Sequence, residues 1–229
     1  MNKFKMIAET WDHIVPLRSQ DIIIDKTYND IIIPHVINKL SKYLNSDSSI
    51  IDVGCGCGYL TNIIASRYNH IVGVDISGNS IGFCRQNYPQ IKFSNEDIAF
   101  FNSSQNFDLC LAVMALHSMP DLEVFFNKIR SLLLSGGYLL ILIPHPCFWP
   151  LKNIANTGFR YETDSEYTIP FSTKSHGSYN IDFIYFHRTL SQYINCFCKY
   201  NFSIIECDEL IEDDHDQPHI LSFLLKLSK

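Results

Sequence analysis

The stretch SIIDVGCGCGYL, residues 49–60, decides how the chain around it is expected to fold. A short apolar run of strand length contains Asp52, glycines then recur at every second position, and a helix-like run begins at Tyr59. A turn without side chains lets a ligand approach the bare backbone at the carboxyl end of a strand. A second apolar run ends in Asp75, 23 residues after Asp52. Two strand-ending acids separated by glycines predict a pocket for a nucleoside-type cofactor.

Strand-like and helix-like runs alternate from about residue 49 to residue 143. Nearly continuous apolar strands joined by helices predict an α/β protein with a parallel, Rossmann-like sheet that is covered on both faces. The third helix is expected to end in a glycine turn at residues 135–137. The strand-like runs are Ser49–Val53, His70–Asp75, Ile91–Ser94, Asp108–Val113 and Tyr138–Ile143, and the helix-like runs are Tyr59–Arg67, Ser80–Tyr88 and Asp121–Leu134.

The segments that flank this core are less regular. Before it, Tyr28–Leu44 carries an apolar stripe at helical spacing and is expected to help close the cofactor site. After it, residues 144–184 are rich in aromatic residues and prolines without a clear period; we interpret them as a lid, with a surface excursion as the alternative. A helix at Thr189–Tyr200 and strands at Phe202–Glu206 and Ile220–Leu227 follow. We predict one domain, 1–229, made of a helical cap (1–48), a cofactor-binding core (49–143), a lid (144–186) and a C-terminal helix and strands (187–229).

The composition excludes several classes of protein. Hydrophobic residues make up 46% and charged residues 18% of the chain, as in ordinary globular proteins. A net charge of −6 argues against a nucleic-acid partner, because phosphate binding requires clustered Lys and Arg. The sequence contains neither an apolar run of about 18 residues nor a signal-peptide pattern. We therefore expect a cytoplasmic protein without a membrane partner.

Cysteines and acids are also arranged without a metal-site pattern. The eight cysteines include no C-x-x-C pair, so we expect reduced thiols rather than disulfides or a zinc site. The acidic run at residues 212–216 lacks the spacing of a metal site, and we interpret it as a solvated loop. The sequence predicts no metal.

The glycine spacing distinguishes two kinds of cofactor. A dinucleotide fingerprint reads G-x-G-x-x-G, but Tyr59 occupies the place of its last glycine. The pattern D-x-G-x-G-x-G instead resembles motif I of the class I S-adenosylmethionine (SAM) methyltransferases. The resemblance implies that the glycine loop holds the methionine part of SAM and that the acid after the second strand binds the ribose hydroxyls. The positions that it assigns here are Asp52, Gly54, Cys55, Gly56, Gly58, Asp75 and Ile76.

Later motifs extend the resemblance. NEDI, residues 95–98, resembles the loop after the third strand, which implies that Asp97 binds the adenine amino group and that Ile98 lies beside the ring. NFDLCLAVMALHSMPDL, residues 106–122, resembles the fourth strand and its loop. The residues that this motif implies at the methionine end of SAM are Ala112, Val113 and Met114, with His117 near the methyl group.

LLLSGGYLLILIPHPCF, residues 132–148, resembles the family's fifth strand with its preceding turn. Its HPCF ending, at residues 145–148, is similar to a subgroup of bacterial small-molecule methyltransferases. The family fold implies seven strands in the order 3-2-1-4-5-7-6, with the last strand antiparallel and the aromatic lid inserted after strand five.

The resemblance implies an enzyme that transfers the methyl group of SAM to an N or O atom of a small aromatic or heterocyclic metabolite, in natural product biosynthesis. Histidines titrate near neutral pH and are the candidate bases, in the order His145, His117 and His187. The candidate substrate-binding residues are Tyr28, Arg18, Trp11, Phe148 and Tyr161. Three alternatives stay open: an NAD-dependent oxidoreductase, a SAM-binding regulatory or scaffold protein without catalysis, and a protein or peptide methyltransferase.

Overall fold

The computed structural model describes residues 3–163, 165–173, 176–211 and 216–228. The chain forms two compact units, Met1–Asn102 with Pro170–Phe183 and Ser103–Ile169 with Ile184–Lys229. The elements of the first unit are α1 (Lys3–Asp21), the π-helix η1 (Thr27–Ile32), α2 (Ile33–Tyr43), β1 (Ser49–Val53), α3 (Tyr59–Ala65), β2 (His70–Asp75), α4 (Gly78–Asn87) and β3 (Lys92–Asn95). Those of the second are β4 (Phe107–Val113), η2 (Leu116–Ser118), α5 (Leu122–Leu132), β5 (Leu133–Pro144), α6 (Trp149–Asn153), η3 (Ala155–Thr157), α7 (Leu190–Lys199), β8 (Phe202–Leu210) and β9 (Ile220–Leu227). A hairpin of β6 (Ser165–Thr173) and β7 (Gly177–His187) has segments in both units.

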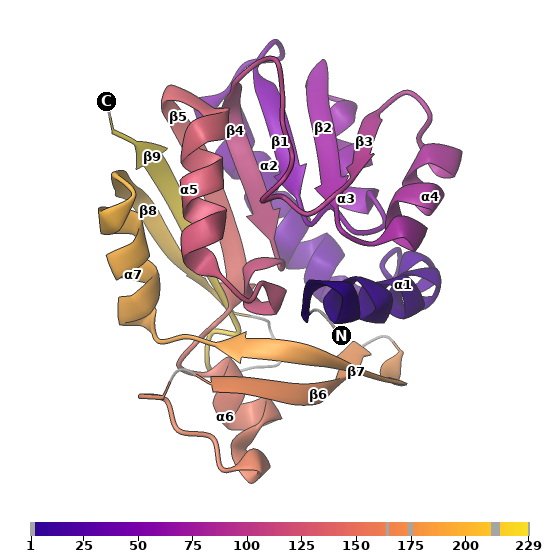
Figure 1. Cartoon of the computed structure of the whole chain (residues 1–229), viewed down its shortest axis with the longest axis vertical. Coiled ribbons are helices and arrows are strands. Elements are labelled where there is room, and N and C mark those ends of the chain that lie inside the picture. Colours follow the sequence, from indigo (N-terminus) through magenta and orange to yellow (C-terminus); the bar gives the residue numbers. More distant parts are fainter. Residues whose placement is uncertain (1–2, 164, 174–175, 212–215, 229) are drawn as a thin grey trace. The chain divides into compact units, whose positions relative to one another are not determined.

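The first unit contains three parallel strands that end beside the glycine motif (Figure 1). β1 pairs with β2, and β2 pairs with β3. Both faces of β1 are buried, which is why its sequence is apolar without alternation. Helix α1 packs on α4, whose first turn is capped by the Ser77 side chain accepting from the Ser80 N–H. The amphipathic stripe predicted before the core is buried at Ile32, Val36 and Leu40.

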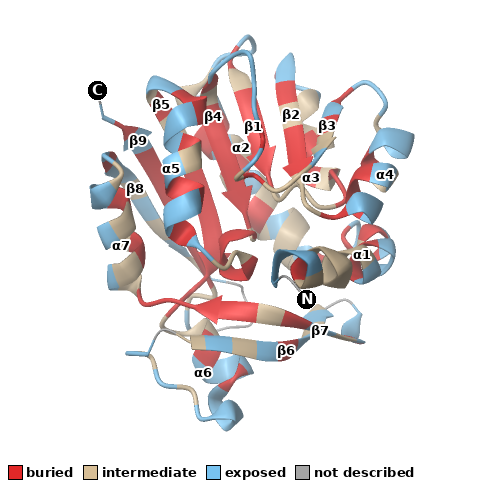
Figure 2. Cartoon of the chain, in the orientation of Figure 1, coloured by how far each residue is buried: buried red, intermediate tan, exposed pale blue. Residues whose placement is uncertain are grey.

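The second unit contains parallel β4 and β5, followed by the antiparallel pairs β5–β9 and β9–β8. The strand order of the seven-stranded sheet is β3-β2-β1-β4-β5-β9-β8, which confirms the predicted fold class and order. Figure 1 shows α5 lying over β4 and β5, and Figure 2 shows how completely β4, β5 and β9 are buried. Rings of α5, α7 and β9 form the contact between these elements, through Phe126, Phe197 and Phe223.

The junction between α5 and β5 differs from the prediction. The helix ends at Leu132 rather than Leu134, and the expected turn at residues 135–137 lies within β5. The pairing with β4 shifts register there, because β5 bulges between Leu133 and Tyr138. A Cβ on Gly137 would lie 2.9 Å from the Leu134 carbonyl oxygen, so this bulge requires glycine.

The segment expected to be an irregular lid contains regular structure. It forms α6, η3 and the β6–β7 hairpin, and β7 continues to His187, one residue beyond the predicted lid boundary at 186. Helix α1 lies within the helical cap predicted for residues 1–48, but its bounds were not predicted, since its apolar residues do not follow a clear helical stripe. The division into a cap, core and lid within one domain stays a prediction.

Across the ranges that the structure describes, helices are too short or too polar to cross a bilayer. All eight cysteines are free thiols. Residues 212–215 of the acidic run lie outside the described residues.

Candidate functional site

The glycine loop after β1 depends on backbone that other residues rarely adopt. The φ angles of Gly54, Gly56 and Gly58 are +72°, +54° and +73°, so all three lie in the left-handed region. Their spacing therefore follows from the path of the chain. The loop is fixed to β2 because the Gly54 N–H donates to the Val74 carbonyl at 2.8 Å, and α3 begins directly after it at Tyr59.

Asp75, at the carboxyl end of β2, holds this loop through its side chain. One carboxylate oxygen accepts from the Gly56 N–H and the other from the Ser77 N–H, each at 2.8 Å. Burial raises the pKa of Asp75 and the Asp12 charge adds to this, while the two backbone donors oppose it. A carboxylate has about four acceptor positions, so hydroxyl groups can still bind beside the two N–H donors.

Asp52, in β1, lies beneath the same loop and is 2% exposed. Its carboxylate accepts from the Thr61 hydroxyl at 2.6 Å. Burial raises its pKa to about 6; the Thr61 hydrogen bond opposes this shift and the Asp75 charge adds to it. This hydrogen bond joins Asp52 to the first turn of α3, and the Asp52 carboxylate is buried rather than exposed to solvent.

The N-terminal segment covers the loop. Val15 and Ile22 pack with Cys57 of the loop, and the Tyr28 ring packs against this cluster. Tyr59 extends the contact, since its hydroxyl donates to the Asn29 side chain at 3.0 Å. The segment Tyr28–Leu44, which was expected to help close the cofactor site, contributes Tyr28 and Asn29 to these contacts, and its role in closing the site stays a prediction.

The positive charge of Arg18, a candidate substrate-binding residue, is balanced by two neighbouring acids. Its guanidinium lies 2.9 Å from Asp21 and 2.7 Å from Asp25, and 5.5 Å from the centre of the Tyr28 ring. Burial would lower the pKa of Arg18, but the charges of the two acids outweigh it and raise the pKa. Trp11, another candidate, packs its ring against the hairpin residues Phe171 and Phe183 at 5.7 and 6.0 Å.

The loop after β3 presents the adenine candidates. Asp97 accepts from the Ala99 N–H at 2.9 Å through one carboxylate oxygen. Ile98 is buried beside it. This tight turn fixes the direction of the Asp97 carboxylate.

In the second unit, the chain leaves β4 through strained backbone. Ala112 is fully buried, and Met114 has a φ angle of +53°, which is rare for a residue with a side chain. The Met114 N–H donates to the Leu142 carbonyl of β5 at 2.8 Å, which holds this conformation. The short helix η2, which contains His117, follows.

Two of the candidate histidines belong to one aromatic cluster. The His117 ring lies 6.0 Å from Tyr185, and the His187 ring lies 6.3 Å from it. Burial, with a contribution from the Arg188 charge, lowers the pKa of His117 to about 3, so this side chain is neutral at pH 7. His187 donates from Nε2 to the Tyr161 carbonyl at 2.9 Å, which leaves Nδ1 as its unprotonated nitrogen.

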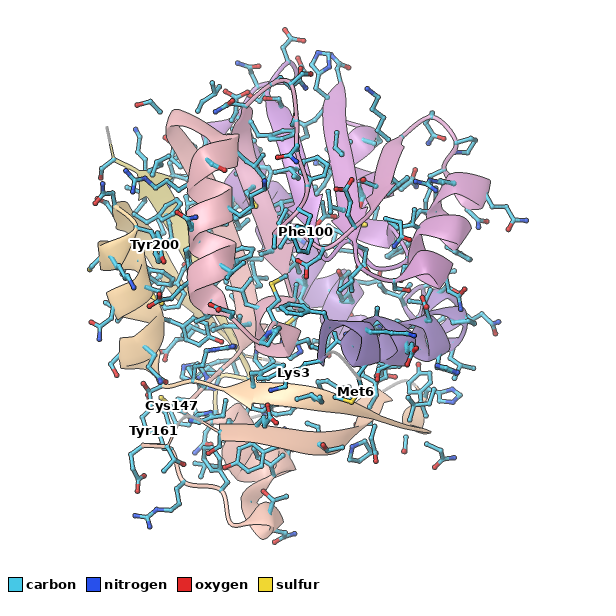
Figure 3. All side chains as sticks on the ribbon, viewed as in Figure 1. Lys3, Met6, Phe100, Cys147, Tyr161 and Tyr200 are labelled. Carbon is cyan, nitrogen blue, oxygen red and sulfur yellow. The ribbon has the colours of Figure 1, made fainter. Side chains whose placement is uncertain are left out.

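Tyr161, between η3 and β6, connects this part of the chain to α7. Its hydroxyl accepts from the Leu190 N–H at 2.8 Å, at the first residue of that helix. Figure 3 shows Tyr161 next to Cys147. Burial is the main reason that the pKa of Tyr161 is raised, and a hydrogen bond to the Cys147 thiol raises it further.

His145, the first-ranked histidine, has both ring nitrogens engaged. Its Nδ1 accepts from the Cys147 N–H at 3.2 Å, so Nε2 carries the proton that is donated to Glu209 at 2.9 Å. Its ring lies 4.7 Å from that of Phe148. None of the ring contacts within the described residues joins His145 to His117 or His187.

The match to known proteins agrees with this geometry. Residues 44–198 match the family described as "Methyltransferase domain". The chain belongs to this methyltransferase family. The matched segment begins before β1 and ends in α7, so it includes the glycine loop, Asp75 and the three histidines.

Relatives and solved structures support the fold of this chain. A trans-aconitate 2-methyltransferase of Variovorax paradoxus is 35% identical over 98 residues, which are 42% of this chain and 38% of that protein. The chain thus spans well under half the length of that curated relative. A SAM-dependent methyltransferase of Listeria monocytogenes has a TM-score of 0.67 at 19% identity, over 84% of this chain and 97% of that one. The N-methyltransferase NodS of Bradyrhizobium japonicum, solved with S-adenosylhomocysteine (SAH), has a TM-score of 0.67 at 15% identity over both full chains.

Four polar residues of this chain form contacts that the sequence does not predict. Thr61 binds Asp52, and Asp12 accepts from the Ser77 hydroxyl at 2.6 Å. Arg188 donates to two carbonyls of the segment after β4. Ser77 carried a signal, since a serine just before a helix is a common N-cap. In the described part of the chain, no three His, Cys, Asp or Glu side chains gather as a metal site.

Proposed function

We propose that the protein transfers a methyl group from SAM to an N or O atom of a small, flat metabolite and releases SAH. The observation that carries this proposal is the carboxylate of Asp75 at the tip of β2, bonded to Gly56 of a loop whose three glycines are left-handed. That arrangement occurs in a chain of the methyltransferase family.

The donor would bind mainly through the first unit. The bare glycine loop leaves room for the amino-acid part of SAM, and Asp75 offers its remaining acceptor positions to the ribose hydroxyls. Asp97 and Ile98 suit the adenine, as an acceptor for its amino group and an apolar surface for its ring. Ala112, Val113 and Met114 stay candidates for the methionine end.

Methyl transfer from a sulfonium is an in-line displacement. The S–CH₃ bond breaks while the new bond to the acceptor atom forms, and the sulfonium charge disappears. The protein must therefore position the acceptor about 3 Å from the methyl carbon and exclude water. A protonated acceptor must also lose a proton to a base.

Among the candidate bases, the observed tautomer favours His187 over His145, and the low pKa of His117 makes it a weak base at pH 7. Both nitrogens of His145 are engaged by Cys147 and Glu209, whereas Nδ1 of His187 is unprotonated in the observed arrangement. The aromatic side chains around His187 support a flat acceptor, because rings prefer to stack on flat ligands. A peptide acceptor is the alternative, as is a SAM-binding protein without catalysis.

The decisive experiment measures SAH binding by calorimetry. We expect the wild-type protein to bind SAH and Asp75→Ala to bind it at least about tenfold more weakly, because a hydrogen bond to a charged group contributes about 1.5–3 kcal/mol. Asp97→Ala should cause a smaller loss. Asp30→Ala, at an exposed acid of η1, is the matched control and should leave the affinity unchanged.

The same preparation distinguishes the alternatives. Absence of SAH binding in the wild type, or equal affinity in Asp75→Ala, contradicts the proposal. Transfer of labelled methyl from SAM to a metabolite panel supports a small acceptor, and transfer only to peptides supports the peptide alternative. SAH binding without transfer to any acceptor supports the non-catalytic one.

A further inference from the structure

Arg188, directly after β7, is a buried cation that pairs with no carboxylate of the described residues. Its exposed fraction is 6%. Nη1 donates to the Leu116 carbonyl at 3.1 Å and Nη2 to the Met119 carbonyl at 2.5 Å. The guanidinium carbon also lies 5.4 Å from the centre of the Phe186 ring. Carbonyl groups and a ring replace only part of the hydration that a buried ion loses, so the site favours an anion.

The guanidinium has donors left for such an anion. It carries five N–H groups, and the bonds to Leu116 and Met119 use two of them. A carboxylate accepts two parallel N–H bonds from one guanidinium, because both groups are planar and their spacing matches. A lysine ammonium group lacks this planar pair of N–H donors, so lysine could not form the same two bonds.

Among the described residues, no carboxylate bonds to the Arg188 guanidinium. His117 is neutral at pH 7, because burial and the Arg188 charge lower its pKa to about 3. The acids of the neighbouring α5 are engaged elsewhere: Glu123 pairs with Lys199, and Asp121 caps the helix by accepting from the Val124 N–H. The nearby acids therefore bond to groups other than Arg188.

A second polar group lies in the segment that Arg188 holds. The Ser118 side chain is 7% exposed, and its hydroxyl forms no hydrogen bond with any described residue. An unpaired buried hydroxyl costs stability, and a ligand oxygen would satisfy it. Ser118 belongs to η2, which follows the carboxyl end of the parallel strand β4, where ligands bind in open α/β sheets.

We propose that Arg188 binds a carboxylate or similar oxyanion of the methyl acceptor, with Ser118 as a further donor. The acceptors would then be small acids. This inference rests on the proposed function, because it names the substrate class of the same site. It also makes Arg188 a substrate-binding residue rather than only a brace for the segment after β4.

The test compares acids with their uncharged counterparts by calorimetry. The probes are benzoate, phenylacetate and succinate, each beside its methyl ester, with phenylphosphonate to separate a preference for carboxylate from one for any oxyanion. Each is titrated into the full chain with and without SAH. We expect at least one acid to bind in preference to its ester, and Arg188→Gln to weaken that acid at least about 30-fold.

Two further variants isolate the guanidinium. Arg188→Lys keeps the charge without the planar pair of N–H donors and should weaken the acid less than Arg188→Gln, which keeps the test usable if the glutamine variant unfolds. Arg130→Gln, which removes an exposed guanidinium from the last turn of α5, should leave acid binding unchanged.

The inference is overturned if no acid is preferred over its ester, or if folded Arg188→Gln and Arg188→Lys bind the acid as tightly as the wild type does. A wild-type protein that binds SAH without preferring acids removes this inference and leaves the proposed function standing. If the protein binds acids through Arg188 but does not bind SAH, the proposed function is removed and the acid site stands.

Discussion

Gly56 and Gly58 share a left-handed backbone but have different surroundings, which separates two reasons for a glycine. A Cβ at Gly56 would meet nothing within 4 Å, so only its φ angle of +54° opposes a side chain. A Cβ at Gly58 would lie 2.8 Å from the Cys84 sulfur and 3.2 Å from the Phe93 ring. Both positions carry backbone strain, and only Gly58 adds a steric clash.

We therefore expect Gly56→Ala to lower the free energy of unfolding by about 1–2 kcal/mol and Gly58→Ala to lower it by more. The control is Gly82→Ala in α4, where a Cβ also meets nothing and alanine should add about 0.5–1 kcal/mol. Urea unfolding of the three variants measures these differences. A Gly56→Ala protein as stable as Gly82→Ala would contradict the argument from backbone strain.

Asp52 gives the stability a specific pH dependence. Its pKa rises from 3.8 to about 6 on folding because it is buried, so the folded protein binds this proton more tightly than the unfolded chain. The Asp52 contribution therefore becomes less favourable as the pH rises from about 4 to about 6, and it stays unfavourable above that range. Asn at this position is neutral throughout.

We expect Asp52→Asn to become more stable relative to wild type between pH 4 and pH 7, by up to about 3 kcal/mol. Urea unfolding across this range measures the difference. Thr61→Val removes the hydroxyl that favours the charged form, so its stability should fall more steeply with pH than that of the wild type. Parallel pH profiles for Asp52→Asn and wild type would rule out this account.

At the scale of the element, α7 begins with a complete capping box. The Thr189 hydroxyl accepts from the Gln192 N–H at 3.2 Å, and the Gln192 side chain accepts from the Thr189 N–H at 2.6 Å. We expect Thr189→Ala to lower the free energy of unfolding by about 1 kcal/mol and Thr189→Ser to leave it nearly unchanged, since serine also caps. Equal urea midpoints for both variants would show that this cap contributes little.

The same scale shows which elements the sequence could predict. The strands of the core were found because burial on both faces makes them uniformly apolar, and α7 was found because it starts with a cap and has an apolar stripe. The β6–β7 hairpin was not predicted, because the proline within β6 argues against a strand. Helix α1 falls within the predicted helical cap, but its bounds were not predicted, because it packs by a few residues, such as Val15, rather than by a continuous stripe.

At the scale of the whole molecule, the order of the seven strands was predictable and the polar contacts were not. The strand order follows from the family resemblance and the alternation of the core, and it is the observed order. The candidate donor-site positions could be named because glycines and strand-ending acids leave a local signal. The Arg188 contacts could not, because they join residues about 70 positions apart, and no local pattern records them.

The bond between Asp75 and the Gly56 amide has a consequence for anyone who redesigns this protein. One carboxylate both shapes the loop and is the group proposed to grip the sugar of the donor. Altering the acid to accept another nucleoside would therefore also release the loop, and reshaping the loop would turn the acid. The two positions form one unit of design, so new donor specificity has to be sought by changing them together.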